Sequence, residues 1–228
     1  STEDTLTALL TVRNLSHRYN ADVLLSFADV LLSRGALLMV RGPSGSGKST
    51  LLHLLGGVLP ITSDAGSVLL DGTDVGSLTS KQRDGLRPFV VGWMPQRHSM
   101  IGSVSVLDNV LLPVALARRV TGADRMRASE LLRALEIESL AQRRPADISV
   151  GQLARVNLAR ALAAQPKLLL ADEPSAALDD ASVNAVASVI AVYVSEGGSA
   201  IVASHDGRLR DSLLRMLGDR FSERSVVP

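Results

Sequence analysis

The chain has 228 residues, 46% of them hydrophobic and 21% charged, as is usual for a globular protein of one large or two small domains. Its net charge of +1, without a dense run of Lys and Arg among aromatic residues, excludes an extended electrostatic surface for nucleic acid, so we expect no nucleic-acid partner. The absence of cysteine excludes disulfides and thiolate metal sites. No apolar stretch approaches ~18 residues and the first residues are not the basic start of a signal peptide, so we expect a chain that itself neither spans a membrane nor is exported.

The first predicted element is a half-buried strand at residues 10–15, where apolar and polar side chains alternate before Tyr19. Two interpretations of Tyr19 are open at this point. Its ring is either a half-buried packing group at the strand end or a flat surface for adenine, on which stacking is worth ~1–3 kcal/mol per base. The rest of the chain has to decide between them.

The most specific motif is a glycine-rich loop between a predicted strand at 36–41 and a predicted helix at 50–55. The loop consists of Gly42, Pro43, Ser44, Gly45, Ser46, Gly47, Lys48, Ser49 and Thr50. This is the G-x-x-x-x-G-K-[ST] pattern of a P-loop, in which backbone N–H groups surround a polyphosphate at the positive end of a helix dipole. Lys48 then reaches the β- and γ-phosphates, and the Ser49 hydroxyl joins a Mg²⁺ ion. The flanking strand and helix disfavour the alternative, a Gly/Ser turn with a solvated lysine.

Residues 66–75 contain Asp71-Gly72 between short apolar runs, which predicts a β-hairpin beside the β-α unit. A further predicted strand at 89–95 leads to Gln96. The pattern then becomes helical for about 70 residues, far longer than a plain β-α-β step of ~30 residues requires, so we expect an inserted helical subdomain.

Two capping boxes support this helical segment. Ser105 to Asp108 predicts the start of a helix that runs through Leu116, and Ser149 to Gln152 predicts the start of a second. The segment also holds several arginines, which predict a solvated face, with contact to a partner or to lipid head groups as the alternative. They are Arg118, Arg119, Arg125, Arg127, Arg143 and Arg144.

Two carboxylates follow the apolar run at 168–171, which predicts a buried parallel strand. Asp172 suits a Mg²⁺ ion, and Glu173 can polarise a water molecule at the strand end, where open α/β sheets bind ligands. The alternative is a solvated acidic turn. His205 follows the predicted strand at 199–204 and is either a surface residue or a contact to a γ-phosphate.

These pieces stand in an order that resembles the nucleotide-binding subunits of ABC transporters, from about Leu10 to about Asp206. The resemblance implies an α/β P-loop NTPase of ABC type, with a parallel-sheet core, an antiparallel β subdomain and an inserted helical subdomain. It implies a single ABC ATPase domain over residues 1–228, with the helical subdomain at about 97–165. It also implies ATP and Mg²⁺ as ligands and a homodimer of ATPase subunits.

The resemblance assigns roles residue by residue: Tyr19 stacks on adenine, Gln96 contacts Mg²⁺ or water and senses the transmembrane partner, Glu173 is the catalytic glutamate, and His205 is the switch histidine. It assigns catalysis to Glu173, His205, Lys48 and Gln96. It assigns Mg²⁺ binding to Ser49, Gln96 and Asp172. It assigns nucleotide binding to Tyr19, Gly42, Pro43, Ser44, Gly45, Ser46, Gly47, Lys48, Ser49, Thr50, Ser149, Gly151, Gln152 and Asp179.

The chain departs from the family signature Leu-Ser-Gly-Gly-Gln, because it has Val150 between Ser149 and Gly151. In the family this segment caps the nucleotide held by the other subunit. If the backbone there needs a positive φ angle, the β-branched Val150 is strained, and weak hydrolysis follows. This observation motivates an alternative function, a nucleotide-gated regulatory subunit.

Within the family, residues 51–57 and 108–113 look like the ATPases of the lipoprotein-release and macrolide-export group. The resemblance therefore implies an ATPase that drives a separate membrane permease of the export type from the cytoplasmic face of the inner membrane. Soluble ABC proteins of translation or DNA repair fit less well, since they usually carry two cassettes or a long coiled-coil insertion.

Overall fold

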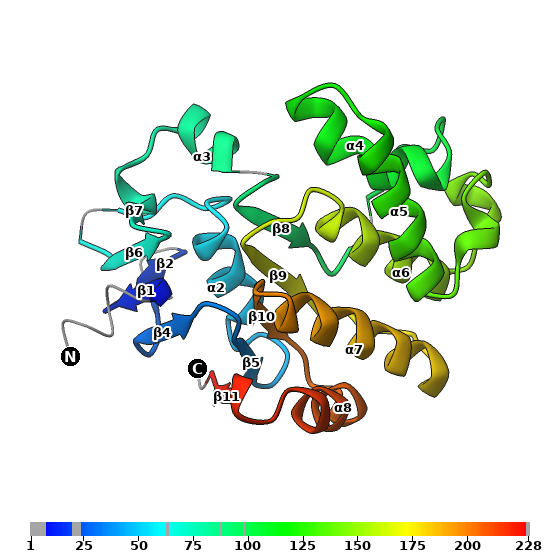
Figure 1. Cartoon of the computed structure of the whole chain (residues 1–228). Coiled ribbons are helices and arrows are strands. Elements are labelled where there is room, and N and C mark those ends of the chain that lie inside the picture. The colour runs from blue at the N-terminus through cyan, green and yellow to red at the C-terminus, as the bar shows by residue number, and fades with distance from the viewer. Residues whose placement is uncertain (1–7, 20–23, 63, 87, 98, 227–228) are drawn as a thin grey trace.

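The computed structural model describes residues 8–19, 24–62, 64–86, 88–97 and 99–226, and its centre is a five-stranded sheet (Figure 1). Neighbouring strands of this sheet are parallel throughout. In spatial order the strands are β11 (Phe221–Ser225), β5 (Leu37–Arg41), β10 (Ser199–Ala203), β9 (Leu168–Asp172) and β8 (Val91–Met94). Every residue of β9 and β10 is buried, as the continuous apolar runs predicted for central parallel strands.

A second, antiparallel sheet lies beside the first. Its strands are β4 (Val30–Ser33), β1 (Ala8–Arg13), β6 (Ser67–Leu70) and β7 (Thr73–Asp74). The predicted hairpin is confirmed, because β6 and β7 pair across Asp71 and Gly72, which both have the positive φ angles that a tight hairpin turn requires. The segment after residue 15 does more than close β1, since β2 (Ser16–Arg18) pairs with β3 (Leu24–Ser26).

Two hydrophobic cores cover opposite faces of the parallel sheet, since successive side chains of a strand point to opposite faces. On β5, Leu38 and Val40 join the core shared with the antiparallel sheet and with α2 (Lys48–Leu55). Leu37 and Met39 join the core on the other side. The cores therefore bury both faces of β5, the strand that leads into the glycine-rich loop.

Three helices occupy the chain between β8 and β9, together with two single-turn 3₁₀ helices. They are α4 (Val106–Ala117), α5 (Gly122–Ala134) and α6 (Val150–Leu162), with η2 (Glu138–Leu140) and η3 (Pro145–Asp147). Both predicted helix starts are confirmed: Ser105 accepts a hydrogen bond from the Asp108 N–H, and Ser149 accepts one from Gln152. Of the six arginines for which the sequence predicted a solvated face, five are exposed and Arg127 is half-buried.

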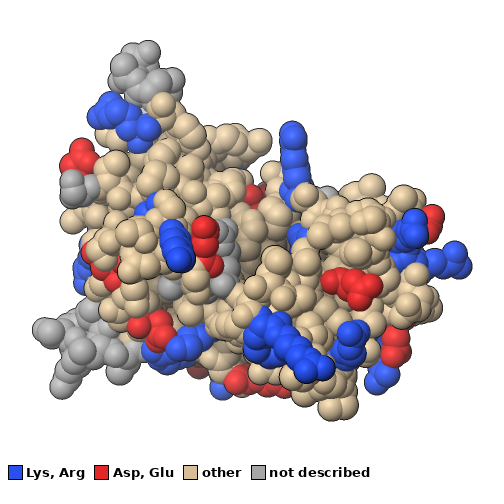
Figure 2. Space-filling model, turned by 90° about the horizontal axis from the view of Figure 1, so that it is seen from above, with Lys and Arg blue, Asp and Glu red and all other residues tan. Residues whose placement is uncertain are grey.

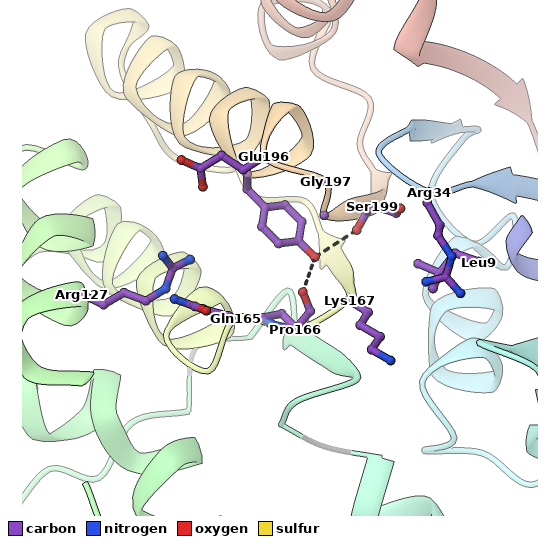
Figure 3. A pocket seen from close by; sticks show the side chains of 11 residues that line it. Leu9, Arg34, Arg127, Gln165, Pro166, Lys167, Glu196, Gly197 and Ser199 are labelled. Atoms are coloured by element: carbon purple, nitrogen blue, oxygen red, sulfur yellow. Dashed lines mark hydrogen bonds between the residues drawn. The ribbon is translucent and has the colours of Figure 1, made fainter. Parts of the chain in front are cut away.

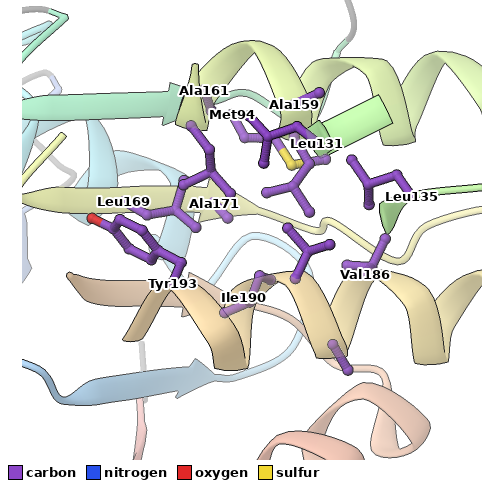
Figure 4. Close-up of a cluster of buried hydrophobic side chains, with 14 of the residues drawn as sticks. Met94, Leu131, Leu135, Ala159, Ala161, Leu169, Ala171, Val186, Ile190 and Tyr193 are labelled. Atoms are coloured by element: carbon purple, nitrogen blue, oxygen red, sulfur yellow. The ribbon is translucent and has the colours of Figure 1, made fainter. Parts of the chain in front are cut away.

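The helices of this region share a core with the sheet rather than forming one of their own (Figure 4). Leu131 and Leu135 of the α5 segment pack in one cluster with Ala171 of β9 and with Val186 and Ile190 of α7 (Asp180–Ser195). This shared core holds the start of α6 close to the segment that precedes α7.

The remaining helices are α3 (Ser80–Leu86), α8 (Gly207–Leu217), η1 (Val75–Ser77) and η4 (Gly218–Arg220). Within the described part of the chain, no helix is both long and apolar enough to cross a bilayer.

Candidate active site

The glycine-rich loop connects the carboxyl end of β5 to the first turn of α2. Gly47 has a φ angle of 95°, and a Cβ atom there would come within 2.9 Å of the Leu25 side chain. A Cβ atom at Gly42 would lie 2.6 Å from both the Ser46 hydroxyl and the Val226 carbonyl oxygen. The loop can fold this tightly only with glycine at both positions.

Lys48 is almost fully buried, and its ammonium group lies across this loop. The Nζ atom donates hydrogen bonds to the carbonyl oxygens of Gly42, at 2.7 Å, and Pro43, at 3.0 Å. The N-cap of α2 is Gly47, which has no side chain to cap the helix, and the first turn contains no acidic residue. The positive end of the helix dipole and a buried cation therefore meet at one place, which is the requirement for binding a polyphosphate.

Asp172 lies at the end of β9 and accepts a 2.6 Å hydrogen bond from the Ser49 hydroxyl. Burial raises the pKa of the Asp172 carboxyl, and the neighbouring Glu173 raises it further, while Ser49 opposes both effects. Among the described residues, no three acidic or histidine side chains gather as a self-sufficient metal site. One carboxylate and one hydroxyl instead fit Mg²⁺, which takes few protein ligands and completes its shell with substrate phosphates and water.

Glu173 occupies a left-handed backbone conformation with a φ angle of 50°, which costs a residue with a side chain on the order of 1–3 kcal/mol. Its carboxylate is buried and is held by two residues of the loop that follows β10. Ser204 donates to Oε2 at 3.1 Å, and the Nδ1 atom of His205 lies 2.8 Å from Oε1. The strained turn therefore directs a carboxylate towards the loop and fixes its orientation.

The aromatic ring of Tyr19 lies over the same loop. Its hydroxyl hydrogen-bonds with the Thr50 hydroxyl, the residue is 56% exposed, and the His17 ring packs edge-on at 4.8 Å between ring centres. A free ring face beside a phosphate-binding loop can accept a nucleobase. Gln96, exposed at the end of β8, also lines this cavity.

The cavity has a volume of about 510 Å³ and opens at the carboxyl ends of the parallel strands. It is lined by Tyr19, Leu25, Gly42, Pro43, Ser44, Gly45, Gly47, Lys48, Ser49, Thr50, Gln96, Asp172, Glu173 and His205. Of the predicted loop residues only Ser46 does not line it, and its buried hydroxyl has no hydrogen-bond partner among the described residues. The sequence analysis missed Leu25 and the Ser204 contact, for which no local motif exists.

The remaining predicted residues lie outside this cavity. Ser149 and Gln152 form a reciprocal capping box at the start of α6, with the Ser149 N–H donating to the Gln152 side chain at 2.8 Å. A Cβ atom at Gly151 would lie 3.3 Å from the Ala177 carbonyl oxygen, so α6 packs closely on that segment. Asp179 is exposed and caps α7. The structure does not bring these residues to their own chain's cavity.

The condition for strain at Val150, a positive φ angle, is not met in the structure. Val150 is the first residue of α6, its φ angle is not positive, and its side chain is 61% exposed. The capping box at Ser149 fixes this backbone as the first turn of a helix, a conformation that valine adopts without strain.

A second hollow of about 310 Å³ lies near the opposite ends of β9 and β10 (Figure 3). It is lined in part by Arg34, Arg127 and Lys167, and the first and last of these both form ion pairs with Asp71. It contains no residue of the glycine-rich loop. On the face shown in Figure 2, positive and negative side chains are scattered over a mostly uncharged surface. The P-loop cavity is therefore the only one of the two with the groups for nucleotide chemistry.

A profile of the ABC transporter family matches residues 25–176, which include the P-loop, Asp172 and Glu173. The chain belongs to the ABC transporter family. It is an ATP-binding subunit of a transporter and an ATPase of this family, and the predicted fold class is confirmed.

Two curated relatives indicate the subgroup of the family that the chain resembles. The chain is 37% identical over 190 residues to the lipoprotein-releasing system ATP-binding protein LolD of Hyphomonas neptunium, which covers 83% of this chain and 82% of the relative. It is also 37% identical over 206 residues to LolD 2 of Caulobacter vibrioides, covering 88% and 90%. The resemblance to the lipoprotein-release group is thus confirmed at the level of sequence similarity.

Solved structures agree with the fold. A dimeric, post-hydrolysis state of the ATP-binding cassette MJ0796 bound to ADP and Pi superposes with a TM-score of 0.81 at 29% identity, covering 96% of this chain and 97% of that one. A second dimeric structure of MJ0796 gives a TM-score of 0.82 at 28% identity, covering 95% and 94%.

Proposed function

We propose that the chain hydrolyses magnesium-ATP in a head-to-tail dimer of two copies and thereby drives a separate membrane permease. The observation that carries this proposal is the split of the site between two surfaces. Lys48, Asp172 and Glu173 line one cavity, whereas Ser149 and Gly151 lie outside it at the start of α6. A second copy can bring its own α6 over the open cavity, and the dimers seen for MJ0796 support this arrangement.

Different residues of the cavity would bind different parts of ATP. Tyr19 offers its exposed ring to adenine, the backbone N–H groups of the loop and Lys48 hold the phosphates, and the partner's α6 would add a helix N-terminus at the terminal phosphate. This arrangement places positive charge where negative charge develops during phosphoryl transfer.

Ser49, Asp172 and Gln96 are the residues that would hold Mg²⁺, which supplies neutralisation of the phosphate charge. Glu173 is the general base that takes the proton of the attacking water. Its carboxylate already accepts a hydrogen bond from Ser204, which keeps it oriented as an acceptor. His205, in contact with Oε1, would bind the terminal phosphate.

The LolD relatives support a transporter of the export type, in which the chain sits at the cytoplasmic face of the inner membrane through its permease. We also propose that residues 1–228 form one ABC ATPase domain in which residues 97–165 are the helical subdomain. Gln96 directly precedes this subdomain and lines the cavity, so it is placed to report the nucleotide to the permease.

The alternative function, a regulatory subunit with weak hydrolysis, depended on strain at Val150. Because Val150 has an ordinary helical backbone, we expect Val150→Gly to leave the turnover number within about fivefold of the parent, since glycine in the first turn costs at most ~1 kcal/mol. A many-fold increase in steady-state phosphate release would instead favour the regulatory function.

The direct test of hydrolysis is Glu173→Gln. We expect magnesium-ATP binding to be retained and turnover to fall by about 10²- to 10⁴-fold, the usual contribution of a general base. Glu138→Gln is the matched control, because Glu138 pairs with Arg133 in the helical region, outside the cavity. If Glu173→Gln hydrolyses ATP at the parental rate, Glu173 is not the base.

A further inference from the structure

The proposed mechanism leaves one charged cluster near the cavity unused. Arg208, in the first turn of α8, bridges two loops that are distant in sequence. Its Nε and one terminal nitrogen donate to the two oxygens of Asp206, at 3.1 and 2.9 Å. Its other terminal nitrogen donates to Asp180 at 2.7 Å and to the Leu178 carbonyl oxygen at 3.3 Å.

Asp206 connects this bridge to the catalytic carboxylate. The Asp206 N–H donates to the Ser204 hydroxyl at 3.1 Å, and that hydroxyl donates to Oε2 of Glu173. His205, between the two, faces the other oxygen of the same carboxylate. The loop formed by residues 204–206 therefore holds Glu173 at one end and Arg208 at the other.

Leu178 connects the bridge to the helix that lies outside the cavity. A Cβ atom at Gly151 would lie 3.2 Å from the Leu178 side chain, so the start of α6 rests directly on this residue. Because α6 packs on Leu178, a shift of α6 towards this residue has to move the segment at residues 175–179. Arg208 is hydrogen-bonded to the end of this segment, at the Leu178 carbonyl oxygen.

We propose that Arg208 is a positioning residue that couples two parts of the same chain, the Glu173 carboxylate and the start of α6. Glu173 acts on the nucleotide bound by its own chain, and the start of α6 contacts the nucleotide bound by the other chain. The two ATP sites of the dimer then communicate through a bridge of hydrogen bonds within each subunit. This proposal rests on the proposed dimeric ATPase and names how its two sites are linked.

Arginine is suited to this role, because its planar fork serves two sets of acceptors at fixed angles, whereas lysine presents a single point charge. The pair with Asp180 is exposed, with Asp180 84% and Arg208 48% accessible at their side chains, whereas the Asp206 side chain is 13% accessible. Exposed ion pairs contribute little to stability, so the loss of Arg208 should change catalysis and leave folding intact.

The test compares Arg208→Gln and Arg208→Lys with the parent and with Arg133→Gln. Arg133 is the matched control, because it makes the same two-pronged contact, to Glu138, in the helical region. We expect Arg208→Gln to lower kcat roughly 5- to 150-fold, the usual size of a coupling between sites, with KM for ATP within twofold and an unchanged Tm. The Hill coefficient for ATP should fall towards one.

Arg208→Lys should recover only part of the loss, and Asp180→Asn combined with Arg208→Gln should be no slower than Arg208→Gln alone, since both remove the same bridge. The inference is overturned if Arg208→Gln keeps the parental kcat and Hill coefficient, or if Arg133→Gln loses activity to the same extent. If the parent itself does not hydrolyse ATP, and Glu173→Gln changes nothing, the proposed function fails instead.

Discussion

The P-loop cavity and the helical region between β8 and β9 place acidic side chains in opposite environments. In the helical region, Asp124 and Glu138 form two-pronged pairs with arginines near the surface. In the cavity, Asp172 and Glu173 stand side by side, less than a tenth exposed. Surface charges stabilise only weakly and cost little, whereas buried charges of like sign are expensive.

The pKa directions follow this difference. Hydrogen bonds from the arginines hold the pKa values of Asp124 and Glu138 below their ordinary values. Burial raises the pKa of Asp172 instead. Buried charges that lower stability are retained where they bind a ligand or take part in a reaction. The comparison therefore distinguishes acidic residues that keep the surface solvated from those that act in the site.

The largest effect that sharpens this comparison is expected from Lys48→Ala. Removing a buried ammonium that holds phosphate loses a charge-assisted hydrogen bond of ~1.5–3 kcal/mol, so affinity for magnesium-ATP should fall roughly 10- to 150-fold. Lys167→Ala, which removes a lysine paired with Asp71 outside the cavity, should leave the affinity unchanged. Isothermal titration of both variants measures the contrast, and equal affinities for the parent and Lys48→Ala would contradict it.

An intermediate effect is expected from Asp172→Asn in the absence of nucleotide. A pKa raised by folding means that stability is highest at low pH and is lost as the pH rises through the folded value, and each unit of pKa corresponds to about 1.4 kcal/mol. At neutral pH the neutral asparagine should therefore raise Tm by about 2–4 °C for each kcal/mol recovered.

This advantage of Asp172→Asn should shrink as the pH falls into the ordinary aspartate range, where the parent carboxyl is also neutral. Addition of magnesium-ATP should reverse the order of the two melting curves, because only the parent keeps the carboxylate for the metal. Thermal unfolding scanned over pH, with and without magnesium-ATP, measures both. A variant less stable than the parent at neutral pH without nucleotide would show that the buried charge costs nothing.

The smallest effect is expected from Arg133→Gln. Its pair with Glu138 is exposed, and such pairs frequently contribute nothing measurable to stability. We therefore expect unchanged melting curves and unchanged ATP turnover. A clear loss of turnover in this variant would break the proposed contrast, because it would make a helical surface pair part of the chemistry.

Local rules predicted much of the fold. The strand that leads into the P-loop, the hairpin at Asp71 and the capped starts of α4 and α6 each depend on residues a few positions apart, and all formed as expected. By contrast, β11 completes the parallel sheet beside β5 although its sequence, Phe-Ser-Glu-Arg-Ser, has no apolar run. That pairing is made by tertiary contacts that periodicity does not encode.

The same division holds for the site. The motifs predicted that the P-loop, Asp172, Glu173 and His205 lie together, since parallel strands end at one edge of a sheet, and these residues line one cavity. The sequence left open whether Val150 is strained, because a family pattern does not give a φ angle, and the structure places Val150 in the first turn of a capped helix. The Arg208 bridge was invisible, because it joins loops about thirty residues apart whose proximity depends on the packing of α7 and α8.

The most direct test of the central claim, a site completed by two chains, is the mass of Glu173→Gln in solution. Sedimentation velocity should show a monomer without nucleotide and a dimer when magnesium-ATP is added, because slow hydrolysis traps the closed pair. Adding Ser149→Ala at the start of α6 should weaken that dimer. A Glu173→Gln variant that binds magnesium-ATP and yet remains monomeric at every concentration tested would contradict the account.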